Sequence, residues 1–159
     1  MSQEHHYRLR TTWTGAVHGP TTKYNAYSRE HTIEMDGKPM LTGSADAAFL
    51  GDAALYNPED LLVAALSSCH MLAYLATCAS ARVPILAYQD DATGTMLQKP
   101  VGGHFTEVTL RPRVTIANAD QIEKARELHA VAARQCFIAG SVNFPVHHIP
   151  EIEAAGAAA

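Results

Sequence analysis

The sequence predicts an α+β fold with a largely antiparallel sheet, and three observations support this. Apolar and polar residues alternate over 7–14 and 104–116, which is the period of a half-buried strand. Residues 57–82 and 120–136 are typical of helices. The expected order is strands, helix, strands, helix, strand, and no linker divides it. We therefore expect a single domain over residues 1–159.

The segment before the first helix is predicted to form a small antiparallel sheet. Residues 26–36 alternate like 7–14, and Asp36-Gly37 is a strong signal for a two-residue hairpin turn. Residues 38–42 are then expected to return as the next strand. Residues 43–56 are small and polar and are expected to form a loop.

The first predicted helix, 57–82, is apolar on every side. Asn57 can cap it, Pro58 suits its first turn, and Glu59 and Asp60 complement its dipole. A helix without a polar face is a buried helix, and this one would be a rod about 39 Å long. One small domain can hardly bury such a rod, so we expect a homodimer wrapped around paired central helices.

Between and after the helices the sequence predicts three strands. Residues 86–98 form one, with Gly94 as a bulge or bend. Residues 104–116 form the clearest one, which Pro112 interrupts, so that an edge or bulge position is expected. Residues 142–152 form the last one, broken by two prolines.

The second predicted helix has one inward face. It is expected to begin near Asp120, with Glu123 completing a capping box, and to run to about residue 136. Its inward stripe consists of Ile122, Ala125, His129, Ala132 and Cys136.

Composition excludes several classes of protein. Twelve Lys and Arg against 16 Asp and Glu give a net charge of −4, and no basic run occurs. We therefore expect neither a nucleic-acid partner nor an anionic membrane surface. The N-terminal residues have no apolar signal region, and no run of about 18 apolar residues predicts a membrane span. Three cysteines are too few for a disulfide scaffold and favour the reducing cytoplasm.

Cys69 lies in the middle of the apolar helix, beside Ser67, Ser68 and His70. It could be a buried structural cysteine. It could instead be a reactive thiol, because its polar neighbours are costly in a helix unless they face a cleft or a partner. The helix N-terminus is about 18 Å away, so a working thiolate would need a cation. Arg29 is the candidate, because it is expected on the apolar face of the 26–36 strand, with Ile33 and Met35. The alternative is that it leaves the sheet at a bulge or at the strand end.

The other two cysteines are expected to have different roles. Cys136 could form a redox pair with Cys69 if their Cα atoms come within about 4.4–6.8 Å. Cys78 points to the opposite side of the helix and is expected to fill the core or an interface. Nine histidines occur without an HExxH, CxxC or HxH pattern, so no metal site is expected. Serine-hydrolase and nucleotide-binding glycine motifs are absent from the sequence.

Two segments carry a family resemblance. Residues 57–62 (Asn-Pro-Glu-Asp-Leu-Leu) and 64–69 (Ala-Ala-Leu-Ser-Ser-Cys) resemble the central-helix signature of the OsmC/Ohr family of thiol peroxidases, with Cys69 ten residues after Glu59. Residues 128–136 resemble the second-cysteine helix of that family. The usual Cys-Pro of that helix is Cys136-Phe137 here. The resemblance extends from about residue 7 to residue 152.

The resemblance implies an OsmC-like fold, in which antiparallel sheets wrap around two central helices in an intertwined homodimer. It implies that Cys69 is the peroxidatic thiolate and Cys136 the resolving thiol. Arg29 would be the cation, and Glu59 the carboxylate that positions it. The substrate would be an organic hydroperoxide. The reductant would be an external dithiol, a lipoylated or thioredoxin-type protein, with no bound cofactor.

Helix geometry adds one hypothesis to this picture. Glu59 and Cys69 would lie about 15 Å apart and 80° out of phase on one helix, so they cannot touch. Either Arg29 spans the gap, or the partner subunit supplies the glutamate or the arginine, and we expect the second, a composite site. Two alternatives stay open: an OsmC-like module that binds a small apolar ligand without catalysis, and a metal- or thioester-handling protein that uses Cys69 and His70.

Overall fold

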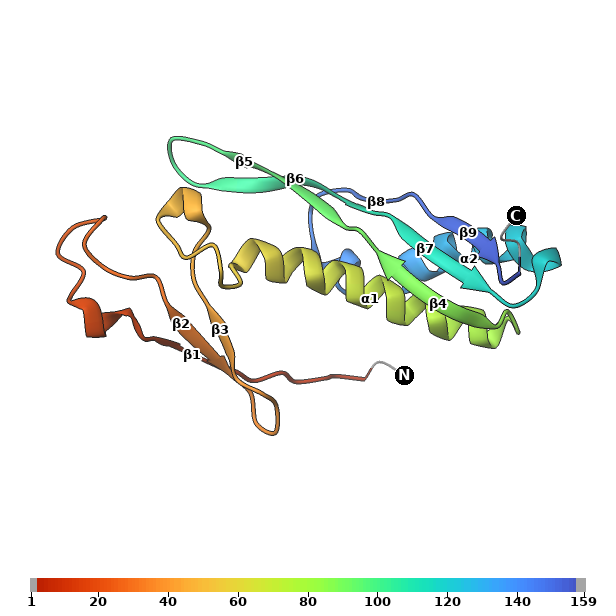
Figure 1. The fold of residues 1–159 in the computed structure, drawn as a ribbon, viewed down its shortest axis with the longest axis horizontal. Coiled ribbons are helices and arrows are strands. Elements are labelled where there is room, and N and C mark those ends of the chain that lie inside the picture. The colour runs from red at the N-terminus through yellow and green to blue at the C-terminus, as the bar shows by residue number, and fades with distance from the viewer. Residues whose placement is uncertain (1–2, 157–159) are drawn as a thin grey trace. The chain divides into compact units, whose positions relative to one another are not determined.

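The computed structural model describes residues 3–156, and its two helices and nine strands confirm the predicted α+β class (Figure 1). The chain forms two compact units, residues 1–61 and 62–159. A single domain stays a prediction. The helices are α1 (Pro58–Ser80) and α2 (Ile122–Gln135). The strands are β1 (Arg10–Trp13), β2 (His31–Glu34), β3 (Leu41–Gly43), β4 (Ile85–Asp90), β5 (Thr93–Gln98), β6 (Gly103–Leu110), β7 (Pro112–Ile116), β8 (Val146–His148) and β9 (Glu151–Ala154).

The first unit holds the predicted small sheet, in the order β1-β2-β3 with antiparallel pairing throughout. The chain turns at Asp36-Gly37, and Gly37 has a φ of 73°. Ile33 pairs with Leu41, however, which is one residue out of the register of a two-residue hairpin, so the predicted hairpin type is wrong. The strands are shorter than the alternation predicts, and β2 begins at His31. Arg29 therefore precedes the strand, and the prediction that it lies on the apolar face of that strand is wrong.

The long strand pair of the second unit is divided at a bend. β4 pairs with β7 and β5 with β6, both antiparallel. At the bend the Arg111 N–H donates to Asp90 Oδ1 at 2.6 Å, which takes it out of the strand ladder. Residues 86–98 and 104–116 were each predicted as one strand and are two. Pro112 begins β7, where a missing N–H is tolerated. An edge or a bulge was predicted for Pro112. β7 is central in its sheet, so the edge is wrong; the strand is instead interrupted directly before Pro112.

The last predicted strand, 142–152, is also two strands. β8 adds to β6 and β9 adds to β7, both in parallel. Two three-stranded sheets result, β5-β6-β8 and β4-β7-β9. Gly94 on β5 is needed for close packing, because a Cβ there would lie 2.7 Å from the Phe105 ring and 2.9 Å from Val63 Cγ2. The register shift falls one residue later, between Thr95 and Met96.

The ends of the helices follow the predicted signals only in part. Asn57 caps α1, accepting a 2.7 Å hydrogen bond from the Asp60 N–H. α2 begins at Ile122 after a short 3-10 turn, and no side chain caps it. The predicted capping box between Asp120 and Glu123 is therefore wrong. Asp120 lies inside the 3-10 turn, Ala119–Gln121, and not at the position before the first residue of α2, so its side chain is not placed to cap the helix.

Both helices pack on the sheets of the second unit (Figure 1). α1 and α2 cover β4-β7-β9 through a buried cluster that includes Tyr74, Val114 and Ala132. The first half of α1 covers β5-β6-β8, where Leu66 meets Val108. The core of this unit is thus built around α1.

α1 is not buried on every side within one chain. Its buried residues recur every fourth position, at Leu66, His70, Tyr74 and Cys78, whereas Leu72 is 63% exposed. By length and composition alone this helix could span a membrane, although the sequence was expected to contain no such segment. Its buried stripe packs on two sheets. The apolar face left open is the one for which we expected a second copy.

Candidate functional site

Cys69 and Cys136 are brought together in the second unit. Cys69 is half-buried on α1, and Cys136 is 3% exposed at the end of α2. Both are free thiols. The pKa of Cys136 is raised to about 11, first by burial and second by a hydrogen bond with Cys69. Cys136 therefore keeps its proton at neutral pH, while Cys69 is the more accessible sulfur.

The loop after α2 also holds the second sulfur. The Ala139 N–H points at Cys136 Sγ from 3.5 Å, and it lowers the pKa of that thiol against the larger effect of burial. Cys136 ends the helix with an extended backbone conformation, which turns Phe137 outward. Cys78 is fully buried, and burial raises the pKa of its thiol. This fits the prediction that Cys78 fills the core.

The serines beside Cys69 have structural partners. Ser67 Oγ donates to Asp90 Oδ2 at 2.5 Å, which ties α1 to the end of β4. Ser68 Oγ donates to the Ala64 carbonyl one turn earlier on its own helix. Neither hydroxyl therefore needs a cleft to be satisfied, and their presence is not evidence of a reactive site.

A largely apolar pocket of about 540 Å³ opens beside Cys69. Leu72 and Ala73 line it from α1, and Gln135 and Phe137 line it from the end of α2 and the residue after the cysteine. Phe137 is 84% exposed, so its ring forms part of the open rim. Phe137, which stands where the family usually has proline, thus lies at the mouth of the pocket beside Cys69.

Arg29 and Glu59 belong to the first unit. The Arg29 guanidinium donates to the carbonyls of Tyr24 and Tyr27 and lies 4.8 and 4.1 Å from the centres of their rings. Arg29 is therefore satisfied by its own segment. Glu59 is in the first turn of α1, half-buried. Within residues 3–156, no ion pair joins Arg29 to Glu59.

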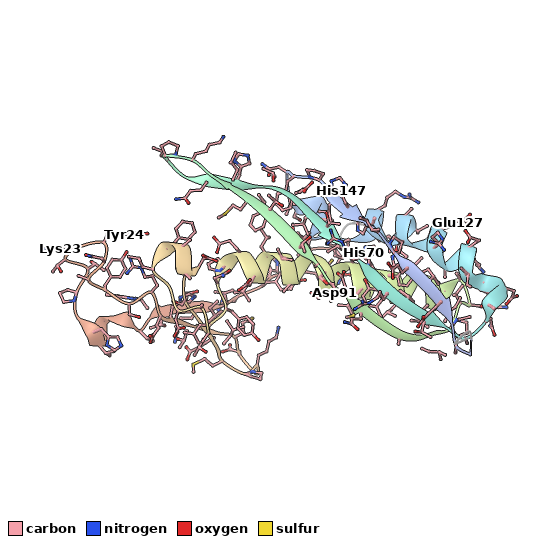
Figure 2. All side chains as sticks on the ribbon, turned by 45° about the horizontal axis from the view of Figure 1, so that its top comes forward. Lys23, Tyr24, His70, Asp91, Glu127 and His147 are labelled. Carbon is pink, nitrogen blue, oxygen red and sulfur yellow. The ribbon has the colours of Figure 1, made fainter. Side chains whose placement is uncertain are left out.

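A cluster of buried histidines in the second unit was not predicted. His70 Nε2 lies 3.0 Å from His129 Nδ1, so one proton joins α1 to α2 (His70 is labelled in Figure 2). His148 from β8 lies against His70, with ring centres 4.2 Å apart, and Tyr74 stacks on His129 at 3.7 Å. Burial lowers the pKa of His70 to about 4 and that of His129 to about 3. Burial also lowers the pKa of His148, so all three rings are neutral at neutral pH.

The histidine cluster does not form a metal centre in this arrangement. No group of three or more His, Cys, Asp or Glu among residues 3–156 is placed to hold a metal ion. His70 and His129 spend one ring nitrogen each on the bond between them. Their remaining ring nitrogens are buried without a partner in the described structure. The contribution of this cluster is a neutral cross-link between the two helices.

Comparison with known proteins decides the family. Residues 51–150 match the sequence profile of OsmC-like proteins. The chain belongs to the OsmC-like protein family. The match covers both candidate cysteines, so the resemblance inferred from α1 and the second-cysteine helix is confirmed. No curated protein matched the chain.

Solved structures of OsmC-like proteins have the same fold. One is an OsmC-like protein of unknown function from Vibrio cholerae, which is 33% identical. The match covers 94% of this chain and all of that one, with a TM-score of 0.81. An organic hydroperoxide resistance protein from Elizabethkingia anophelis is 19% identical over 96% of this chain and 99% of its own, with a TM-score of 0.63. An OsmC-like protein from Mycoplasma pneumoniae is 12% identical, and the match covers 96% of this chain and 99% of that one, with a TM-score of 0.68.

Proposed function

We propose that this OsmC-like protein is a cysteine-based peroxidase that reduces organic hydroperoxides. The observation that carries the proposal is the pairing of an accessible thiol, Cys69, with a buried thiol, Cys136, at an apolar pocket. A buried filler cysteine would need neither the second sulfur nor the pocket. The fold shared with organic hydroperoxide resistance proteins is consistent with this function.

In the first step the Cys69 thiolate attacks the terminal oxygen of the hydroperoxide, ROOH. An S–O bond forms and the O–O bond breaks, so that the sulfur becomes a sulfenic acid and an alkoxide leaves. The alkoxide takes a proton from solvent and departs as the alcohol. The sulfur loses two electrons and the peroxide gains them. The organic part of ROOH would lie against Leu72 and Phe137.

In the second step Cys136 resolves the sulfenic acid. Its sulfur attacks Cys69, the S–O bond breaks, and the hydroxyl leaves as water with the proton of Cys136. The raised pKa of Cys136 suits this order of events, because the proton stays on Cys136 until the sulfenic acid has formed. An external dithiol, a lipoylated or thioredoxin-type protein, would then reduce the disulfide.

We extend the proposal to the remaining expectations from the family resemblance. Arg29 would supply the positive charge and Glu59 would position it, in a homodimer whose sites combine residues of both copies. The free cysteines and the need for a thiol reductant favour the cytoplasm. The exposed apolar face of α1 supports the homodimer.

Steady-state turnover tests the proposal. Purified protein should consume cumene hydroperoxide with a dithiol in a 1:1 ratio, and faster than hydrogen peroxide. Cys69→Ser should abolish turnover, and Cys136→Ser should abolish sustained turnover while leaving the first oxidation intact. Cys78→Ala is the matched control and should retain activity. Equal turnover by wild type and Cys69→Ser would disprove the proposed nucleophile.

The second candidate is a non-catalytic module that binds a small apolar ligand in the same pocket. The exposed Phe137 ring at the rim favours it, because it offers apolar contact without chemistry. A protein of this kind would bind cumyl alcohol yet show no consumption of peroxide above that of Cys69→Ser. The turnover assay therefore separates the two functions.

A further inference from the structure

Two of the residues that line the pocket have polar side chains. One is Cys69, and the other is Gln135. It is the last residue of α2 and directly precedes Cys136. Its side-chain oxygen Oε1 is placed 2.9 Å from Thr77 Oγ1 on α1. A hydrogen bond to the neighbouring helix therefore fixes the amide beside an otherwise apolar surface.

The hydrogen bonds of Thr77 indicate which atom of the amide is left free. Thr77 Oγ1 lies 2.7 Å from the Ala73 carbonyl as well as 2.9 Å from the Gln135 amide. A hydroxyl has one proton, so it cannot donate to both. The hydroxyl, the Ala73 carbonyl and the amide nitrogen are all satisfied when the amide is turned over by 180°, so that Thr77 donates to Ala73 and the amide nitrogen of Gln135, in place of its oxygen, donates to Thr77 Oγ1. The two orientations of an amide have the same shape, so this choice is made by hydrogen bonding. The carbonyl oxygen Oε1 then remains free.

We infer that Gln135 orients the hydroperoxide, through a hydrogen bond that the terminal O–H of ROOH donates to its Oε1. This inference rests on the proposed function. An apolar pocket alone binds the organic part but does not decide which peroxide oxygen faces the sulfur. An acceptor fixed by Thr77 holds the terminal oxygen, the one that becomes part of the sulfenic acid, toward Cys69. Gln135 is thus a positioning residue that lets Cys69 break the O–O bond with the alkoxide as leaving group.

The test measures the first oxidation of Cys69 alone, in a Cys136→Ser background. Reduced protein is mixed with cumene hydroperoxide, and sulfenic acid is trapped with dimedone and counted by mass. A second reaction, with methyl methanethiosulfonate, reports the reactivity of the same thiol toward a reagent that has no O–H group. Loss of one hydrogen bond predicts that Gln135→Leu slows oxidation about tenfold. The thiosulfonate rate should stay within about twofold, since a single contact to the O–H is what the variant removes.

Two further variants sharpen the test. Thr77→Val keeps the shape of the side chain but releases the amide, and should slow oxidation several-fold without changing the thiosulfonate rate. Gln98→Leu, on the exposed surface of β5, is the matched control and should change neither rate.

Three results would overturn the inference. If Gln135→Leu oxidises as fast as its parent, Gln135 does not orient the peroxide, and the proposed function still stands. If the oxidation and thiosulfonate rates fall together, the residue is merely structural. If the parent forms no sulfenic acid, the proposed function fails as well.

Discussion

Acid should weaken this protein through the buried pair His70 and His129. Burial lowers their pKa values from 6.5 to about 4 and about 3, so the folded state binds fewer protons than the unfolded state below pH 6.5. The stability that comes from keeping the rings neutral is fully present above pH 6.5. It falls as the pH drops from 6.5 toward 4. One unit of pKa shift corresponds to ~1.4 kcal/mol, so each histidine should lower the free energy of unfolding by about 3 kcal/mol between neutral pH and pH 4.

The variant His129→Phe isolates this effect. Phenylalanine can keep the stack on Tyr74, now at 3.7 Å between ring centres, and it cannot be protonated. The free energy of unfolding is measured by urea denaturation, followed by circular dichroism at one protein concentration, between pH 7 and pH 4.5. Relative to wild type, the variant should gain ~1.4 kcal/mol per pH unit below pH 6. The difference in unfolding free energy reaches about 2 kcal/mol at pH 4.5. The titration of carboxylates is common to both proteins and cancels in this difference.

The control for this experiment is His104→Phe, which replaces an exposed imidazole by the same ring. Its unfolding free energy should run parallel to that of wild type across the range. If the curves for His129→Phe and wild type are also parallel, the histidine pair is not held neutral by burial, and the reasoning from the cluster is refuted.

Three other predictions follow from particular contacts. Asn57→Ala removes the cap of α1 and should lower the free energy of unfolding by about 1 kcal/mol, whereas Asn118→Ala, where no capping bond exists, should have a smaller effect in the same urea titration. Phe137→Ala should lower kcat/KM for cumene hydroperoxide about tenfold and for hydrogen peroxide much less, with little loss of stability because the ring is 84% exposed; equal losses would contradict an apolar substrate wall. Mixed dimers of Arg29→Ala and Cys69→Ser chains should regain part of the activity if the site is composite, and no recovery in proven heterodimers would contradict it.

The sequence predicted the existence of the elements better than their ends. The sequence predicted both long strand segments of the second unit, 104–116 by its alternation, but not the bend that divides them. That bend depends on Asp90, which accepts hydrogen bonds from Ser67 and from the Arg111 N–H, 23 and 21 residues away in the sequence. Local periodicity contains no information about partners at that distance, so the strands were predicted too long.

The candidate site was predictable where the family motif reached it. The motif identified Cys69 and Cys136, and the inward stripe of α2 correctly included His129. The bond from His129 to His70 joins residues 59 apart, and only folding brings them together. Gln135 was missed, although a polar residue directly before the second cysteine was a signal that the sequence did contain.

The most direct test of the account is the intact mass and peptide map of reduced protein after one equivalent of cumene hydroperoxide. We expect the mass to fall by two protons as a disulfide forms, the map to join Cys69 to Cys136, and a dithiol to reverse the change. A Cys69 that stays free, or that only overoxidises slowly to sulfinic acid, would show that these cysteines are not a redox pair and would contradict the peroxidase function.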